Sequence, residues 1–246
     1  MANIISIIGL FVCIISVVLL MKSSSGTKIL KLASLFLLVF KLTEYAIGNA
    51  KGEFSYPIEI STITYFMFSI TILFNIKKCL HIASFFATLS GVGFFVFYSL
   101  FGSSTLLHYD IGRHIISVIC HGILLIGGIY LFLKNEFKES NKYDIYIVML
   151  AILGHASIFY IDSIKNTTFI YYLIKPEFLK VFSSLWKNHL IQILYYFVLL
   201  LIFSQIIVLF YKLNKIFFIQ KSILSNRKGL DNWSKFNTSL DNKNIQ

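Results

Sequence analysis

Long apolar stretches separated by short polar segments make up most of the chain. Seven stretches are about 17 to 25 residues long, which allows an α-helix to cross about 30 Å of hydrocarbon. Helices are expected because lipid offers no hydrogen-bonding partners, and an open sheet would leave backbone groups unpaired. The expected spans are residues 3–20, 29–47, 57–75, 82–100, 114–133, 145–162 and 190–211. The pattern therefore predicts an all-α integral membrane protein, a bundle of about seven transmembrane helices.

The segment after the last span has a different character. Residues 212–224 are basic, aliphatic and amphipathic, which is typical of a short helix lying along the cytoplasmic interface. Residues 225–246 are polar, which favours disorder. We therefore expect a polytopic transmembrane domain over residues 1–212 and a basic amphipathic and disordered cytoplasmic tail over residues 213–246.

The composition supports this division. Hydrophobic residues make up 57% of the chain and charged residues 13%, whereas soluble domains carry about 25% charged residues. The mean hydropathy is +0.78. No segment outside the spans reaches the size of about 50 residues that a separate domain needs. An ordinary soluble globule is therefore excluded, and the function is expected from groups inside the membrane or at its edge.

Basic residues gather in alternate loops. Fourteen of the 22 lysines and arginines lie in the loops after the first, third and fifth spans or in the tail, and six lie in the other loops. By the positive-inside rule, this predicts an outer N-terminus and a cytoplasmic C-terminus in a bacterial-type plasma membrane, crossed several times. The net charge of +11 then belongs to cytoplasmic loops, so we expect membrane lipids and no nucleic acid as partners.

Polar side chains inside the spans are the most informative feature, because an ionisable group in lipid is costly. Several spans carry such groups toward the outer side. The groups are Lys41 and Glu44 in the second span, Glu59, Ser61 and Thr62 at the start of the third, His114 and His121 in the fifth, and Asp162 in the sixth, where His155 lies near the midplane. The i, i+3 spacing of Lys41 and Glu44 predicts an ion pair, and such a pair also suits a lipid head group.

The fifth span carries a polar stripe. His114, Ser117, His121 and Gly128 follow one another at i, i+3, i+7 and i+14, which places them on one side of a helix. His121 then lies about 10 Å below the outer end of its helix, and Ser61 about 6 Å below the start of the third span. We therefore expect the two side chains to lie at depths where they can meet.

These residues suggest a hydroxyl nucleophile, Ser61 or Thr62, with His121 as the general base. Asp162, or alternatively Glu59, would orient the histidine as the third member of a triad does. Residue types alone favour the alternative, in which Ser and Thr bond to backbone carbonyls and a buried histidine is a neutral donor. Glu59 and Thr62 share a helix face that Ser61 does not, so Thr62 is the better nucleophile if Glu59 faces the site.

Other residues give weaker indications. Ser90, Gly91 and Gly93, with Ala87 one turn before Gly91, predict a small-residue packing face in the fourth span. The histidines lack the spacing of an HExxH-type site, so no metal and no cofactor are expected. The three cysteines are at unrelated positions, which indicates neither a disulfide framework nor a zinc site.

Three segments of the chain resemble a known family. The sequence at Tyr56–Ser61, at His121 and at Asn166–Pro176 is similar to the YwaF and transmembrane protein 164 family of membrane acyltransferases. The resemblance implies an enzyme that moves or hydrolyses lipid acyl chains with a Cys or Thr nucleophile and a His. Ser61 then stands at the cysteine position, His121 at the histidine position, and Thr168 at the asparagine position of a Gly-Thr-Asn motif.

The departures from this family leave two alternatives open. A serine hydroxyl has no appreciable anionic fraction at neutral pH, unlike a thiol with a pKa near about 8.5, so the chain is either a divergent enzyme or an inactive relative. The expected substrate contacts are Glu44, Glu59, His114 and Thr168. A different class is a small transporter or lipid-binding protein, in which Lys41, the acidic residues and the histidines line a polar cavity. A third is a non-catalytic protein that binds partners through its basic tail.

Overall fold

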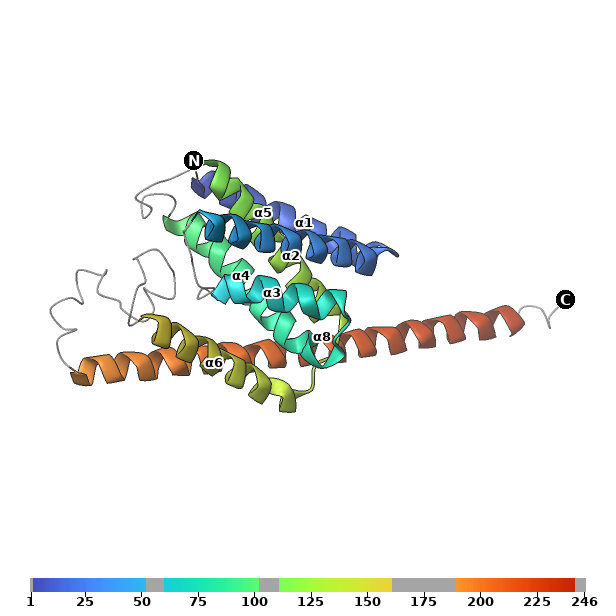
Figure 1. Ribbon diagram of the computed structural model, residues 1–246. Coiled ribbons are helices and arrows are strands. Elements are labelled where there is room, and N and C mark those ends of the chain that lie inside the picture. Colours follow the sequence, from blue (N-terminus) through green and yellow to red (C-terminus); the bar gives the residue numbers. More distant parts are fainter. Residues whose placement is uncertain (1, 52–59, 102–110, 161–188, 242–246) are drawn as a thin grey trace.

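The computed structural model describes residues 2–51, 60–101, 111–160 and 189–241, and their regular structure is helical throughout (Figure 1). The helices are α1 (Ala2–Lys22), α2 (Gly26–Ala50), α3 (Ile60–Leu73), α4 (Leu80–Phe101), α5 (Ile111–Lys134), α6 (Lys142–Tyr160) and α8 (His189–Asp241). Short 3-10 turns, η1 (Lys77–Cys79) and η2 (Glu139–Asn141), precede α4 and α6. The all-α prediction is confirmed for the described residues, and each of the seven expected spans overlaps a helix.

Four helices in the described part of the chain are long and apolar enough to cross a membrane. Their apolar segments are Asn3–Lys22, Lys77–Leu100, His114–Lys134 and Ile193–Ser225. Ile60–Leu73 is apolar but shorter. The remaining helices are less uniformly apolar, and α2 carries several ionisable side chains. Four helices of this length and apolar character are typical of a membrane protein.

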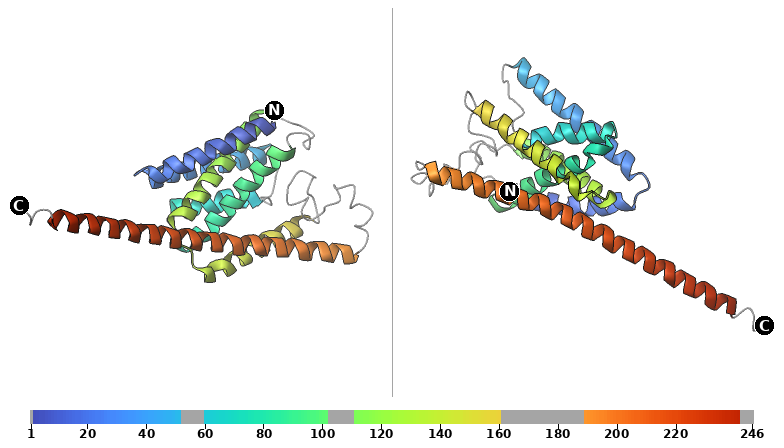
Figure 2. Two further views of the ribbon diagram at one scale, coloured as in Figure 1. Left: turned by 180° about the vertical axis from the view of Figure 1, so that it is seen from behind. Right: turned by 90° about the horizontal axis from the view of Figure 1, so that it is seen from below.

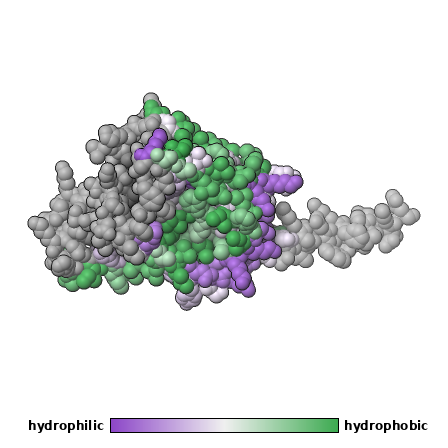
Figure 3. Space-filling view, in the orientation of Figure 1, coloured by the Kyte–Doolittle hydropathy of each residue, from purple (hydrophilic) through white to green (hydrophobic). Residues whose placement is uncertain are grey.

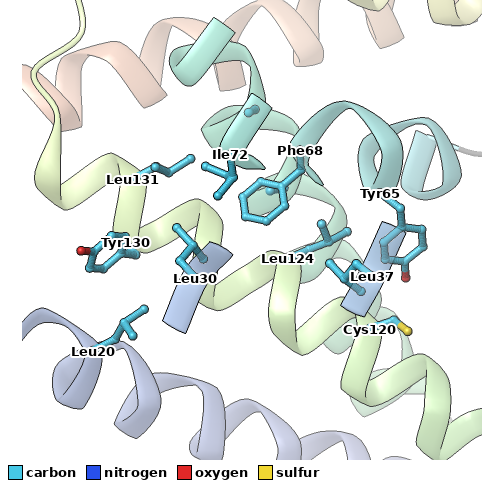
Figure 4. Close-up of a cluster of buried hydrophobic side chains, with 12 residues drawn as sticks. Leu20, Leu30, Leu37, Tyr65, Phe68, Ile72, Cys120, Leu124, Tyr130 and Leu131 are labelled. Carbon is cyan, nitrogen blue, oxygen red and sulfur yellow. The ribbon is translucent and has the colours of Figure 1, made fainter. Parts of the chain in front are cut away.

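The helices α1 to α5 form a bundle, and α6 and α8 lie together along one side of it (Figure 1). Within the bundle, α4 packs against α1, α3 and α5, and α2 packs against α3. A cluster of buried side chains, including Leu37, Phe68 and Leu124, joins α2, α3 and α5 (Figure 4). A second cluster, including Phe86, Ile145 and Ile207, joins α4 to α6 and α8. Packing in these two clusters fixes the positions of the helices relative to one another.

The helices α4 and α5 approach each other closely at small residues. A Cβ atom added to Gly91 would lie 2.6 Å from the Cβ atom of Leu125, and one added to Gly128 would lie 2.6 Å from the backbone nitrogen of Thr88. The Ser84 hydroxyl also donates to the Gly128 carbonyl at 2.8 Å. The predicted packing face is thus confirmed at Gly91. At Gly93, an added Cβ atom would meet nothing within 4 Å.

The surface separates into an apolar flank and a polar end. Many large apolar side chains are exposed, as in Phe11 (62%), Leu32 (70%) and Ile147 (65%). Figure 3 shows hydrophilic residues gathered at one end of this flank. That end holds the exposed lysines at the last turns of α1 and α5, at the start of α2, and before α4 and α6, and we call it the Lys-rich end. An apolar band bordered by charge fits a protein surrounded by lipid.

The longest helix differs from the expectation for the C-terminal segment. Instead of ending at Tyr211, α8 continues to Asp241 over 53 residues, a length of about 80 Å. No proline interrupts this segment, so the helix propagates through the polar residues for which the sequence predicts disorder. In Figures 1 and 2, α8 extends well beyond the bundle.

Candidate functional site

His121 lies between three helices, and its two ring nitrogens have different partners. Its Nδ1 atom lies 2.9 Å from the carbonyl oxygen of Ser117, one turn earlier in α5. A carbonyl only accepts, so Nδ1 carries the proton in this contact, and Nε2 is then the acceptor of the neutral ring. The hydroxyl oxygen of Tyr65 in α3 lies 3.3 Å from Nε2 and 3.0 Å from Nδ1. With this tautomer, Tyr65 can donate only to Nε2, and its oxygen, which lies nearer to Nδ1, can also accept from the Nδ1–H group.

Aromatic rings fix the plane of the His121 imidazole. The Phe94 ring of α4 stacks on it, with centroids 4.0 Å apart and an interplanar angle of 11°. Tyr65 meets it edge-on, at 5.5 Å and 72°. Stacking from α4 and hydrogen bonds from α3 and α5 therefore hold the ring in one orientation.

An ion pair on α2 adjoins this histidine through Tyr65. The Nζ atom of Lys41 lies 2.6 Å from a carboxylate oxygen of Glu44, which confirms the predicted pairing. The same Nζ atom lies 4.7 Å from the centroid of the Tyr65 ring, within the range of a cation–π contact. The Lys41 side chain is 16% exposed and that of Glu44 is 55% exposed. Glu44, Lys41, Tyr65 and His121 thus form a polar chain across α2, α3 and α5.

His114, an expected substrate contact, is enclosed by other helices. Its Nε2 atom lies 3.3 Å from the hydroxyl of Ser6 in α1, and both residues are buried. The Tyr98 ring lies 4.8 Å from its ring, centroid to centroid, and Phe94 lies 5.9 Å away. Phe94 therefore contacts both histidines of the predicted stripe, which confirms that the stripe faces the interior of the bundle.

The expected nucleophiles lie on the same helix as Tyr65, one turn before it. Ser61 and Thr62 occupy the first turn of α3, four and three residues before Tyr65, so both lie toward the Tyr65 side of the helix. The meeting of the third and fifth spans is confirmed by the Tyr65 contact. Among the described residues, however, His121 makes no hydrogen bond to Ser61 or Thr62.

Three expected site residues, Glu59, Asp162 and Thr168, lie outside the described residues. So do Tyr56–Glu59 of one segment that carries the family resemblance and the whole of another, Asn166–Pro176. In the described part of the chain, the Ser117 carbonyl holds Nδ1 of His121, the place that the sequence analysis gave to a carboxylate. No group of three or more His, Cys, Asp or Glu side chains suited to a metal ion occurs there.

Sequence reasoning missed Tyr65. In the sequence, Tyr65 is one of several aromatic residues in an apolar span. The only sign that it belongs to the site is its position one turn after Ser61, on the same side of the helix. A second missed feature is the pair formed by His81 in α4 and Asp144 in α6. His81 is 2% exposed, and its Nε2 atom lies 3.2 Å from a carboxylate oxygen of Asp144. Both residues lie just outside the spans that the apolar pattern predicts.

Asn214 in α8 is also buried and was not singled out. Its amide nitrogen donates to the carbonyls of Phe132 at 2.7 Å and Asn135 at 3.0 Å. Its amide oxygen accepts from the Phe137 N–H at 2.8 Å. One side chain therefore satisfies three backbone groups at the end of α5, and it holds α8 against the bundle.

Comparison with known proteins adds no relative. No family model, no curated protein and no solved structure matches the chain. The fold and the site define the class directly: an all-helical protein in which four of the described helices are long and apolar enough to span a membrane, with a histidine–tyrosine–lysine–glutamate cluster across α2, α3 and α5.

Proposed function

We propose that the protein is an integral-membrane enzyme that transfers or hydrolyses acyl groups of membrane lipids. The observation that supports this is the fixed orientation of His121, whose Nε2 atom lies within 3.3 Å of a hydroxyl of α3 while Nδ1 meets the Ser117 carbonyl. A neutral imidazole with Nδ1 protonated and Nε2 facing a hydroxyl has the arrangement of a general base. The motif resemblance to the YwaF and transmembrane protein 164 family supports the choice of acyl transfer.

In the proposed reaction, Nε2 of His121 accepts the proton of Ser61 or Thr62 while that oxygen attacks the ester carbonyl of a lipid. The ester bond then breaks, and the histidine returns the proton to the departing lipid alcohol. A second lipid hydroxyl or water attacks the acyl-enzyme in the same way and releases the acyl group. The first step requires the nucleophile to replace the Tyr65 hydroxyl at Nε2. Asp162 or Glu59 is proposed to orient the base further.

We further propose that the helices cross the plasma membrane of a bacterial-type cell with the N-terminus outside. The exposed lysines at the Lys-rich end support a cytoplasmic position for that end. The His121 cluster then lies toward the outer leaflet. Glu44 is exposed on the same side and is proposed to contact the substrate head group, as are Glu59 and Thr168, whereas His114 is enclosed.

The experiment is to treat the purified protein in lipid with a fluorophosphonate probe and to map the adduct by mass spectrometry. We expect one adduct, on Ser61 or Thr62, which disappears in the His121→Ala variant because the hydroxyl has lost its base. The matched control is His155→Gln on α6, which should label like the wild type. A wild-type protein that stays unmodified while a known serine hydrolase labels fully would contradict the proposal.

A small transporter or lipid-binding protein is a second candidate. The Lys41–Glu44 pair favours it, because two opposite charges at the edge of the bundle match a zwitterionic head group. Two experiments distinguish the two functions. With His121→Ala, an enzyme loses turnover and keeps ligand binding. A carrier instead moves solute across reconstituted vesicles, and the probe forms no covalent adduct with it.

A further inference from the structure

A hollow opens between α1 and α8 at the Lys-rich end. Its volume is about 490 Å³. Met21 in the last turn of α1 lines one side, and Phe217, Gln220, Lys221, Leu224 and Ser225 of α8 line the other. A volume of this size lies within the range of ligand sites in proteins.

The position of the hollow places it at the edge of the hydrocarbon region. The helix α1 is apolar up to Met21 and ends at Lys22, so its last turn marks the transition to the polar end. The side chains of Met21, Phe217 and Leu224 supply apolar surface to the hollow. A ligand there meets hydrocarbon on one side and the polar end of the bundle on the other.

The polar side of the hollow is basic. Lys221 lines it together with the uncharged Gln220 and Ser225, and none of the lining residues is acidic. Lys22, which follows Met21 at the end of α1, is a further exposed lysine beside the hollow. Basic pockets between membrane helices on the cytoplasmic side suit anionic head groups, and a lysine that lines such a pocket adds to the attraction.

We propose that this hollow binds one anionic phospholipid of the leaflet at the Lys-rich end. Its phosphate contacts Lys221, with Gln220 and Ser225 as hydrogen-bond donors, and its acyl chains lie on Met21, Phe217 and Leu224. Free phosphate would leave the apolar side uncovered. A second copy of the chain would bring its own lysines against these lysines. The hollow shares no residue with the His121 cluster, so this inference stands independently of the proposed enzyme activity.

The test is native mass spectrometry of the full chain in neutral detergent. Phosphatidylglycerol, phosphatidylcholine or inorganic phosphate is added at equal concentration. We expect one phosphatidylglycerol to remain bound, and Lys221→Gln to weaken its binding about fivefold. Lys215→Gln, an exposed lysine of the same helix outside the hollow, is the matched control and should bind like the wild type. Ser225→Trp, which fills the hollow, should also reduce binding.

Other results would overturn the inference. Equal loss in Lys215→Gln and Lys221→Gln would indicate a diffuse charge effect. Equal retention of phosphatidylcholine would indicate that the apolar side alone binds lipid. Retention of inorganic phosphate in place of lipid would assign the hollow to a free anion, and a dimer that excludes lipid would assign it to a second copy.

Discussion

At the scale of single residues, hydroxyl groups of α3 have two different uses. The Thr64 hydroxyl donates to the carbonyl of Ile60 at 2.6 Å, the local bond that threonine commonly makes in helices. The Tyr65 hydroxyl instead crosses to His121 of α5. Thr64 therefore follows the expected alternative, in which a hydroxyl donates to a backbone carbonyl of its own helix. Tyr65 instead links two helices at the site.

The contact between Tyr65 and His121 gives a spectroscopic prediction. In Tyr65→Phe, Nε2 loses its donor while the Ser117 carbonyl still holds Nδ1–H, so the tautomer should stay and only the Nε2 environment should change. We expect the ¹⁵N resonance of His121 Nε2 to shift and that of Nδ1 to remain that of a protonated nitrogen, with a stability loss of about 1 kcal/mol.

The measurement is ¹⁵N NMR of histidine-labelled protein, with His121→Ala to assign the signals. Tyr130→Phe is the control, because Tyr130 is also a buried tyrosine and its hydroxyl contacts Thr27 and Lys134 instead. An unchanged Nε2 resonance in Tyr65→Phe, or a switch of the proton to Nε2, would refute the assignment of the hydrogen bonds.

At the scale of elements, the interface of α4 and α5 depends on which glycine faces the neighbouring helix. Gly91 and Gly93 lie two residues apart, so they point to different sides of α4. Only at Gly91 would a side chain collide with α5, since its Cβ atom would lie 2.8 Å from the Cα atom of Leu125. A side chain at Gly93 has open space.

Paired valine substitutions test this interface. We expect Gly91→Val to lower the free energy of unfolding by about 3 kcal/mol or more, because a collision with backbone forces the helices apart. Gly93→Val should change it by less than about 0.5 kcal/mol. The measurement is reversible unfolding in detergent followed by circular dichroism. Equal effects at the two positions would show that backbone propensity, not packing, decides the result.

An apolar pattern predicts where a helix begins and ends, but not which side of it faces its neighbours. The lengths of the helices follow from the lengths of the apolar stretches, so all seven could be predicted to within a few residues, except the end of α8. The rotation of each helix about its axis could not be predicted from the sequence. In a lipid-facing helix both sides are apolar, so periodicity does not reveal that Tyr65, and not Ser61, meets His121. Such contacts depend on packing between helices.

At the scale of the whole molecule, a few polar contacts attach α6 and α8 to the bundle. His81 of α4 meets Asp144 of α6, and Tyr146 of α6 meets the hydroxyl of Ser204 in α8 at 2.9 Å. Asn214 joins α8 to the end of α5 through three hydrogen bonds. These contacts supplement the apolar cluster around Ile207 and Phe210.

Asn214→Leu should release α8 from the bundle. Leucine has the same branched skeleton as asparagine but leaves three backbone groups without partners, so we expect a loss of stability of about 3 kcal/mol. The observable is protease cleavage of the segment between α5 and α6, which should become faster. Gln205→Leu replaces an exposed amide of the same helix and is the control. Cleavage at the wild-type rate in Asn214→Leu would argue against this anchoring role.

The length of α8 has a mechanical consequence. From Asn214 to Asp241 the helix covers about 40 Å, so a rotation of about 10° around Asn214 displaces Asp241 by about 7 Å. A tilt of α8 by this small angle would therefore move its C-terminal end by more than the pitch of a helix, about 5.4 Å.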